Sequence, residues 1–166
     1  VRDLTQGGEI TKEEHILTKF INCAAKETHF AWYKYKKDND KAERELNSGI
    51  IPEGFKRQMY YTFGDFRDIF FGTDISSCTY IKRTSNAIKS KLGDQATTEK
   101  GGKHIEDYKK LQEWWTIHGP EIWEAMLCAL TNSLTDAEEK KDKIKSTYSY
   151  DELITNGTIP LEEFSS

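Results

Sequence analysis

The chain has 166 residues, a length that suits one ordinary domain and is short for two. Its 24 basic and 28 acidic residues are spread along the whole sequence, so the chain lacks the concentrated basic patch of a nucleic-acid-binding protein. Hydrophobic residues make up only 36%, but four Trp, eight Tyr and eight Phe can each bury a large ring. We therefore expect one folded, helix-rich domain without nucleic-acid partners.

The apolar segments and the two ends of the sequence bear on membrane insertion and completeness. The longest apolar runs, such as 125–130, fall far short of the roughly 20 residues that a membrane span needs, so we expect no membrane insertion. The sequence starts at Val1, without an initiator Met or a signal peptide, and stops abruptly at Ser166. We therefore expect a piece of a longer protein.

The first predicted helix covers residues 11–37. Thr11 and Glu14 have the spacing of a capping box, which would satisfy free amides at the helix start. Apolar and small residues then recur every three or four positions, as on one face of a helix. Residues 38–48 are charged and polar, which leaves a solvated helical extension and a mobile loop both open.

The second predicted helix begins near Pro52, which can occupy a first turn without loss of a hydrogen bond. Gly72 is its expected C-cap. Gly64 lies in its middle, where it should weaken the helix and mark close packing against a neighbour. The apolar stripe consists of Phe55, Met59, Phe63, Phe66 and Phe70.

The remaining elements are also helices. We expect a short third helix at 81–92, a surface loop at 93–102, and a fourth helix from 103 to 117 that Gly119 and Pro120 end. A fifth helix then starts at Pro120 and carries its apolar residues to Leu130. The charged segment 136–143 either continues that helix or is disordered, and the rest is loop-like apart from a short turn at 160–164.

These elements predict an all-α bundle of long helices. Its helical core would extend over about 11–135, followed by a charged and loop-rich tail at 136–166. The clustered indoles of Trp114, Trp115 and Trp123 are better explained as core than as an exposed apolar patch.

The sequence offers no catalytic or metal-binding arrangement. His15 has no second His four residues later, and Cys23 and His29 would lie on different sides of a helix, so we expect no metal site. There is no Gly-x-Ser-x-Gly elbow, no Gly-Lys-Ser/Thr phosphate loop and no Ser or Cys beside an obvious His. We therefore expect neither an enzyme nor a bound cofactor.

Residues 34–37, Lys-Tyr-Lys-Lys, could bind a sulfated glycan or an acidic protein. The simpler interpretation, which we favour from the residues alone, is a solvated last helical turn whose lysines complement the helix dipole.

Composition also leaves open whether Cys23, Cys78 and Cys128 are reduced or paired, since an odd count leaves at least one without a partner inside the chain.

Several strings resemble the Duffy-binding-like domains. They are Phe20-Ile21-Asn22-Cys23-Ala24-Ala25-Lys26-Glu27-Thr28, the run from Pro52 to Asp68, the run from Gly72 to Ser76, and Trp114-Trp115 followed by the run from Gly119 to Leu130. Their order is similar to that in the middle helical subdomain of the beta, gamma or zeta classes in the erythrocyte membrane protein 1 family. These are the variant surface antigens of the malaria parasite Plasmodium falciparum.

The resemblance implies a cell-adhesion module on the extracellular face of the infected erythrocyte membrane. Its expected partners are a host receptor protein such as the intercellular adhesion molecule, or a sulfated glycosaminoglycan, together with neighbouring subdomains and host antibodies. The parent protein would be antigenically variable and anchored in the membrane outside this segment. The alternative is a structural spacer subdomain in a multidomain ectodomain, with no receptor contact of its own.

The family pattern also implies a disulfide between Cys23 and Cys128 and leaves Cys78 without an assigned partner. It implies that the motif residues form the structural core, with Gly64 allowing close contact of backbones. Those core residues are Phe20, Trp32, Phe63, Gly64, Phe66, Trp115 and Trp123. Receptor contacts should instead come from variable outer segments, for which our candidates are Lys34, Lys36, Lys37, Lys41, Arg44, Tyr80, Lys82, Arg83, Lys100 and Lys103.

Overall fold

The computed structural model describes residues 13–72, 79–92, 103–134 and 138–155. Over these residues the chain is all-α, without a strand, as predicted. The helices are α2 (Glu13–Asp38), α3 (Ala42–Asn47), α4 (Glu53–Phe71), α5 (Thr79–Leu92), α6 (Lys103–Thr131), α7 (Glu138–Thr147) and α8 (Tyr150–Thr155).

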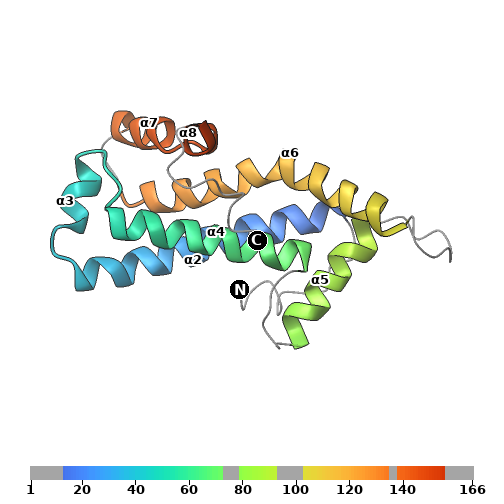
Figure 1. Cartoon of the computed structure of the whole chain (residues 1–166). Helices are drawn as coiled ribbons and strands as arrows, with labels where there is room; N and C mark the ends of the chain where they lie inside the picture. Colours follow the sequence, from blue (N-terminus) through green and yellow to red (C-terminus); the bar gives the residue numbers. More distant parts are fainter. Residues whose placement is uncertain (1–12, 73–78, 93–102, 135–137, 156–166) are drawn as a thin grey trace.

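Three long helices, α2, α4 and α6, form the body of the molecule (Figure 1). The Phe20 ring of α2 lies 6.0 Å from Phe66 near the end of α4 and 6.4 Å from Trp115 of α6. At the other end of α2, the Trp32 ring lies 5.0 Å from Phe55 near the start of α4. Helix α4 therefore runs antiparallel to α2, while α6 runs parallel to it.

Aromatic side chains fill the space between these helices. The Phe63 ring lies 5.4 Å from Trp115 and 5.8 Å from Trp123, and the Phe70 ring is stacked on Trp114 at 4.6 Å. All three indoles are buried, as the core interpretation requires. The aromatic residues predicted for the core are buried as well: Phe20, Trp32, Phe63, Phe66, Trp115 and Trp123.

The boundaries of α4 follow its glycine and proline signals, but the role expected for Gly64 is wrong. Pro52 is the N-cap and Gly72 is the C-cap, with a left-handed φ of 72° that only glycine adopts readily. A Cβ placed on Gly64, by contrast, would meet no atom within 4 Å. Gly64 therefore does not serve a close approach of two backbones.

The predicted break at Gly119 and Pro120 is also wrong, because α6 continues through both residues to Thr131. Proline in a helix interior removes one backbone hydrogen bond and crowds the preceding turn. On either side of it, however, Trp115 and Trp123 pack against the same Phe63 ring. This shared contact keeps the two halves of α6 on one helix face despite the local cost.

The two segments that the sequence left open are helical. Within residues 38–48, α2 ends at Asp38 and the short helix α3 follows at Ala42–Asn47. Residues 138–155 form α7 and α8, in place of the predicted loop-rich tail. The turn expected at 160–164 and the capping box at Thr11 lie outside the described residues.

Helices α7 and α8 pack on the body of the bundle through a few side chains. The Trp123 indole N–H donates to the carbonyl oxygen of Tyr148 at 2.8 Å, and the Ile51 backbone N–H donates to the Tyr148 hydroxyl at 3.1 Å. Ile144 is fully buried. This part of the expected tail therefore belongs to the folded domain.

The disulfide expected between Cys23 and Cys128 is not formed. Cys23 is buried on α2, whereas Cys128 is exposed on α6. Phe20 and Trp115 mark one level of these parallel helices, so Cys128 lies about ten residues further along than Cys23, or roughly 10–15 Å. Because disulfides join Cα atoms roughly 4.4–6.8 Å apart, the pairing does not fit the helix register.

Candidate receptor-binding surface

The residues predicted to contact a receptor fall into two groups at opposite ends of the bundle (Figure 1). Lys34, Lys36, Lys37, Lys41 and Arg44 belong to the end of α2 and to α3 with its N-cap. The other group belongs to α5, to the start of α6 and to the segment between them. Since α2 alone is about 39 Å long at 1.5 Å per residue, the ten residues do not form one continuous site.

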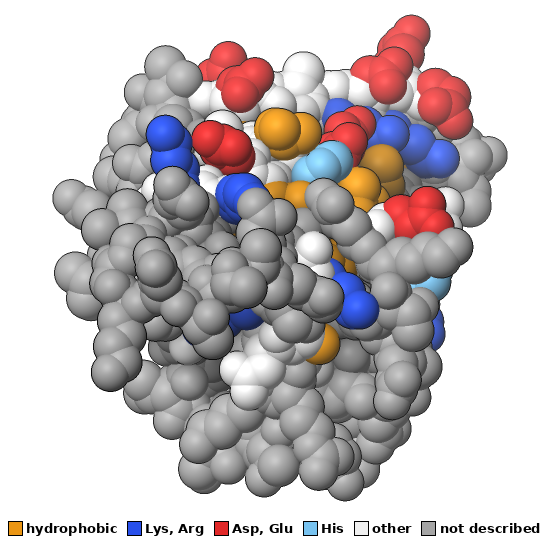
Figure 2. Space-filling model, turned by 90° about the vertical axis from the view of Figure 1, so that its right-hand side faces the viewer, with side chains coloured by type: hydrophobic (Ala, Val, Ile, Leu, Met, Phe, Trp, Pro, Cys, Tyr) orange, Lys and Arg blue, Asp and Glu red, His pale blue; other side chains and the backbone are white. Residues whose placement is uncertain are grey.

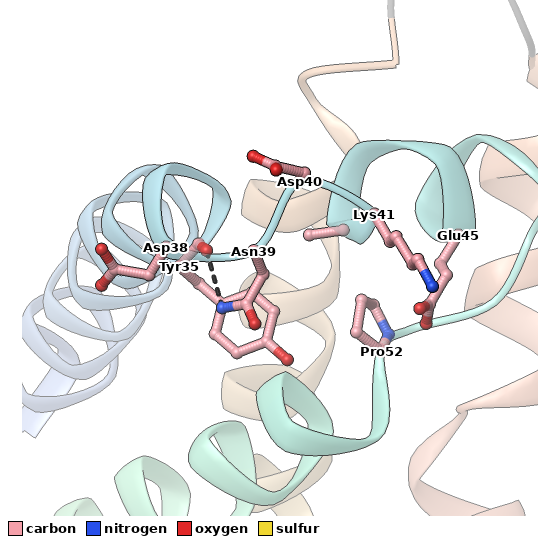
Figure 3. Close-up of a pocket in the computed structure, with 8 residues that line it drawn as sticks. Tyr35, Asp38, Asn39, Asp40, Lys41, Glu45 and Pro52 are labelled. Atoms are coloured by element: carbon pink, nitrogen blue, oxygen red, sulfur yellow. Dashed lines mark hydrogen bonds between the residues drawn. The ribbon is translucent and has the colours of Figure 1, made fainter.

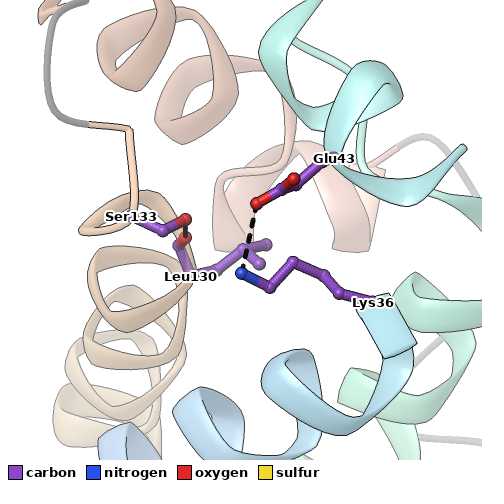
Figure 4. A network of polar contacts seen from close by, with 4 residues as sticks. All are labelled: Lys36, Glu43, Leu130 and Ser133. Atoms are coloured by element: carbon purple, nitrogen blue, oxygen red, sulfur yellow. Dashed lines mark hydrogen bonds and ion pairs between the residues drawn. The ribbon is translucent and has the colours of Figure 1, made fainter. Parts of the chain in front are cut away.

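The first group surrounds the turn from α2 into α3, which local hydrogen bonds hold in place. The Asn39 side-chain amide donates to the carbonyl oxygen of Tyr35 at 3.0 Å and so satisfies a helix-end acceptor. The Lys36 ammonium donates to the Glu43 carboxylate at 3.3 Å and joins α2 to α3 (Figure 4). Lys34, Lys37, Lys41 and Arg44 remain exposed.

A shallow pocket of about 380 Å³ opens beside this turn (Figure 3). Its lining combines the end of α2, the start of α3 and the residue that caps α4. In Figure 3 the carboxylate of Asp38 points away from Pro52 on the far side of the pocket. The lining residues are Tyr35, Asp38, Asn39, Asp40, Lys41, Ala42, Glu45 and Pro52.

The charges around this turn are mixed. Residues 34–45 contain the five predicted basic residues, but also the four acidic residues Asp38, Asp40, Glu43 and Glu45. Protein–protein interfaces have a polar rim and match charges of both signs across the contact, and this end offers both signs close together. The composition of this end therefore favours a protein partner.

The second group cannot be placed atom by atom. The side chains of Tyr80, Lys82, Arg83 and Lys103 are outside the described part of the structure, as is the whole of Lys100. Figure 2 looks onto this end of the bundle and shows basic and acidic side chains around a few hydrophobic ones. These five predictions remain untested.

Sequence reasoning missed two exposed aromatic side chains on α2. Phe30 and Tyr33 are 68% and 55% exposed, and the Lys37 ammonium lies 4.4 Å from the centre of the Tyr33 ring. Both rings fall outside the apolar stripe of the predicted helix, so they do not stand out as core residues. Their position outside that stripe is itself the sequence signal that they face solvent.

A second pocket, of about 240 Å³, lies between α6 and the α7–α8 pair.

The Tyr60 ring stacks on Trp123, which lines this pocket, with centroids 5.5 Å apart. Burial, reinforced by the charges of Glu53 and Tyr148, raises the pKa of Tyr60 to about 12. Its phenol therefore stays protonated at neutral pH and acts as a packed ring rather than as a proton acceptor.

The described residues contain no group of three or more His, Cys, Asp or Glu side chains able to hold a metal ion. None of the described helices is both long and apolar enough to cross a bilayer.

Comparisons with known proteins identify the family. Residues 1–159 match the Duffy binding domain family. Ninety residues, 54% of the chain, are 29% identical to the Duffy receptor of Plasmodium vivax (strain Salvador I), of which they cover 8%. No solved structure matches the chain. The family match spans nearly the whole sequence, and the chain therefore belongs to the Duffy binding domain family.

Proposed function

We propose that this chain is a cell-adhesion module of a parasite surface protein and that it binds a receptor on host cells. The observation that carries the proposal is the family match over residues 1–159, together with the similarity to a protein named Duffy receptor. The matched segment is a small part of that relative, so the activity of the whole relative is not transferred to this chain directly.

The proposed contact surface is the end of α2 with α3, and the proposed partner is a protein. Lys34, Lys37 and Arg44 are exposed there beside acidic side chains, and the Lys36–Glu43 pair holds the two helices together. Interfaces of this kind gain specificity and association rate from complementary charges. A sulfated glycosaminoglycan is the weaker candidate, because the acidic residues would repel its sulfates.

The parent protein proposed here is an erythrocyte membrane protein 1 variant of Plasmodium falciparum, with a domain of the beta, gamma or zeta class. The supporting feature is the order of the four strings that carry the resemblance. Such a protein would display this module on the extracellular face of infected erythrocytes, where host antibodies would select for variation of exposed residues. The aromatic core could stay constant while that surface changes.

A structural spacer is the alternative within the same family. It is favoured by the large part of the relative that lies outside the matched segment, where a receptor site could reside. In that case the outer faces of this chain would contact only neighbouring subdomains of the same protein.

A binding assay separates the two functions. Immobilised chain would be tested for saturable binding of intercellular adhesion molecule ectodomain, heparan sulfate and chondroitin sulfate, and for attachment of cells that display each of them. We expect saturable binding of a protein receptor, weakened by the double reversal Lys34→Glu/Lys37→Glu. The exposed Lys109→Glu on α6 is the matched control. Binding by a longer segment of the parent protein but not by this chain would establish the spacer.

A further inference from the structure

The outward face of the second half of α2 carries an unusual pair of rings. Phe30 and Tyr33 are separated by one helical turn and are 68% and 55% exposed. In Figure 1 this half of α2 lies along the lower edge of the bundle, and no other described helix lies below it. Neither ring belongs to the buried core, and neighbouring exposed rings are the kind of side chain that anchors a protein interface.

The charged side chains on the side of α2 that carries the rings are mostly basic. Between Cys23 and Lys37 the chain has four lysines and one acidic residue, Glu27. Glu27 is partly buried, whereas Lys26, Lys34 and Lys37 are exposed on the side of the helix that carries the rings. The face therefore has an apolar centre with a basic border.

The contact between Lys37 and Tyr33 strengthens this pattern. The ammonium lies 4.4 Å from the ring centre, close enough for a cation–π interaction. It holds the cation over the exposed Tyr33 ring, so the charge of Lys37 and the apolar surface of the rings are presented together. An incoming carboxylate could pair with Lys37 while its neighbouring apolar side chain covers Tyr33 and Phe30.

This combination distinguishes between classes of partner. A sulfated glycan would use the lysines, but it is less apolar than a protein side chain and covers two rings less completely. A protein helix with alternating apolar and acidic residues matches both features, since aromatic anchors in the centre of an interface contribute most of the binding energy. Such a helix would lie along α2 with its anchors three or four residues apart.

We infer that the face formed by Phe30, Tyr33, Lys34 and Lys37 is a docking surface for an acidic protein segment with an apolar stripe. The inference rests on the proposed adhesion function and adds the surface and the chemistry of the partner. It also moves the centre of the interface from the lysines, which sequence reasoning identified, to the two rings beside them.

The test uses a displayed library of helical peptides, selected for binding to the intact chain. We expect enrichment of peptides with Leu or Phe at spacings of three and four, flanked by Asp or Glu. Binding of those peptides should fall at least about tenfold in Phe30→Ala and in Tyr33→Ala, and also in Lys34→Glu/Lys37→Glu. Ile117→Ala on α6, where the side chain is 65% exposed, is the matched control and should leave binding unchanged.

Several results would overturn the inference: no enrichment, enrichment of basic or neutral peptides, or peptides that bind Phe30→Ala as tightly as the unchanged chain. Heparin binding that is lost with the lysines but not with the rings would assign the face to a glycan. Concentration-dependent self-association that Phe30→Ala abolishes, without any selected peptide, would assign it to a second copy.

Failure of this inference is distinguishable from failure of the proposed function. A chain that binds a host receptor with equal affinity before and after the Phe30→Ala change remains an adhesion module and loses this surface. If the chain selects acidic peptides on α2 but binds none of the tested host receptors, the docking surface is supported and the adhesion function is contradicted.

Discussion

Helix α2 carries aromatic rings on both of its faces, and the two sets have opposite environments. Trp32 is 3% exposed and packs on Phe55, whereas the very next residue, Tyr33, is 55% exposed. The inner rings meet their counterparts on α4 and α6, while among the described residues the outer rings contact a lysine and a histidine of their own helix. Aromatic content alone thus does not distinguish a core from a binding surface; the angular position on the helix does.

The largest expected difference between the two faces is in stability. Phe63 is fully buried between Trp115 and Trp123, so Phe63→Ala should lower the free energy of unfolding by about 3–5 kcal/mol. Phe30→Ala should change it by less than about 0.5 kcal/mol. Urea unfolding followed by Trp fluorescence measures both, and equal losses would refute the assigned faces.

The next effect concerns the attachment of α7. Tyr148→Phe removes the hydroxyl that accepts the hydrogen bond from the buried Ile51 N–H, which should cost about 1–3 kcal/mol. Amide hydrogen exchange at Ile51 should accelerate accordingly. The matched control is Tyr33→Phe on the outer face, and no change in Ile51 exchange upon Tyr148→Phe would show that α7 does not depend on this bond.

Alanine substitution should change the stability of the chain in opposite directions at Gly64 within α4 and at Gly72, its C-cap. Gly72→Ala places a side chain at φ 72° and should destabilise the chain by about 1 kcal/mol. Gly64→Ala meets open space and should stabilise the helix by up to about 1 kcal/mol. Thermal unfolding measures the sign of the stability change for each variant. A loss of stability in Gly64→Ala would support the close backbone contact that the sequence predicted and contradict the open space at this position.

The effect expected at Tyr60 is confined to alkaline solution. Its folded-state pKa of about 12 lies above the ordinary 10.0, so the folded chain keeps a proton that the unfolded chain releases. The free energy of unfolding should therefore fall as pH rises from about 10 to about 12, with no contribution from Tyr60 below that window. Tyr60→Phe should flatten this decline; an unchanged pH profile would argue against the raised pKa.

Much of the fold could be predicted, because helical periodicity and capping residues are local signals. The stripe from Phe55 to Phe70 and the caps Pro52 and Gly72 gave the correct bounds of α4. Pro120 predicted a helix end that does not occur, because its local cost is offset by Trp115 and Trp123. Their shared contact with Phe63 is not visible in the local sequence.

The candidate site could be predicted only in part. Lys34, Lys36 and Lys37 stand out as a basic run, but the pairing of Lys36 with Glu43 depends on the turn between α2 and α3. The exposure of Phe30 and Tyr33 depends on which faces α4 and α6 cover. The Cys23–Cys128 pairing failed for a related reason, since helix register follows from packing and not from the order of motifs.

Our central proposal is that a receptor binds the α2 end of the bundle rather than the α5 end. The most direct measurement compares receptor affinity for Lys34→Glu/Lys37→Glu with that for Lys82→Glu/Arg83→Glu, which changes the same charge at the opposite end. We predict at least a tenfold loss, about 1.4 kcal/mol, for the first variant and little change for the second. The reverse pattern, or equal losses from both variants, would contradict the account.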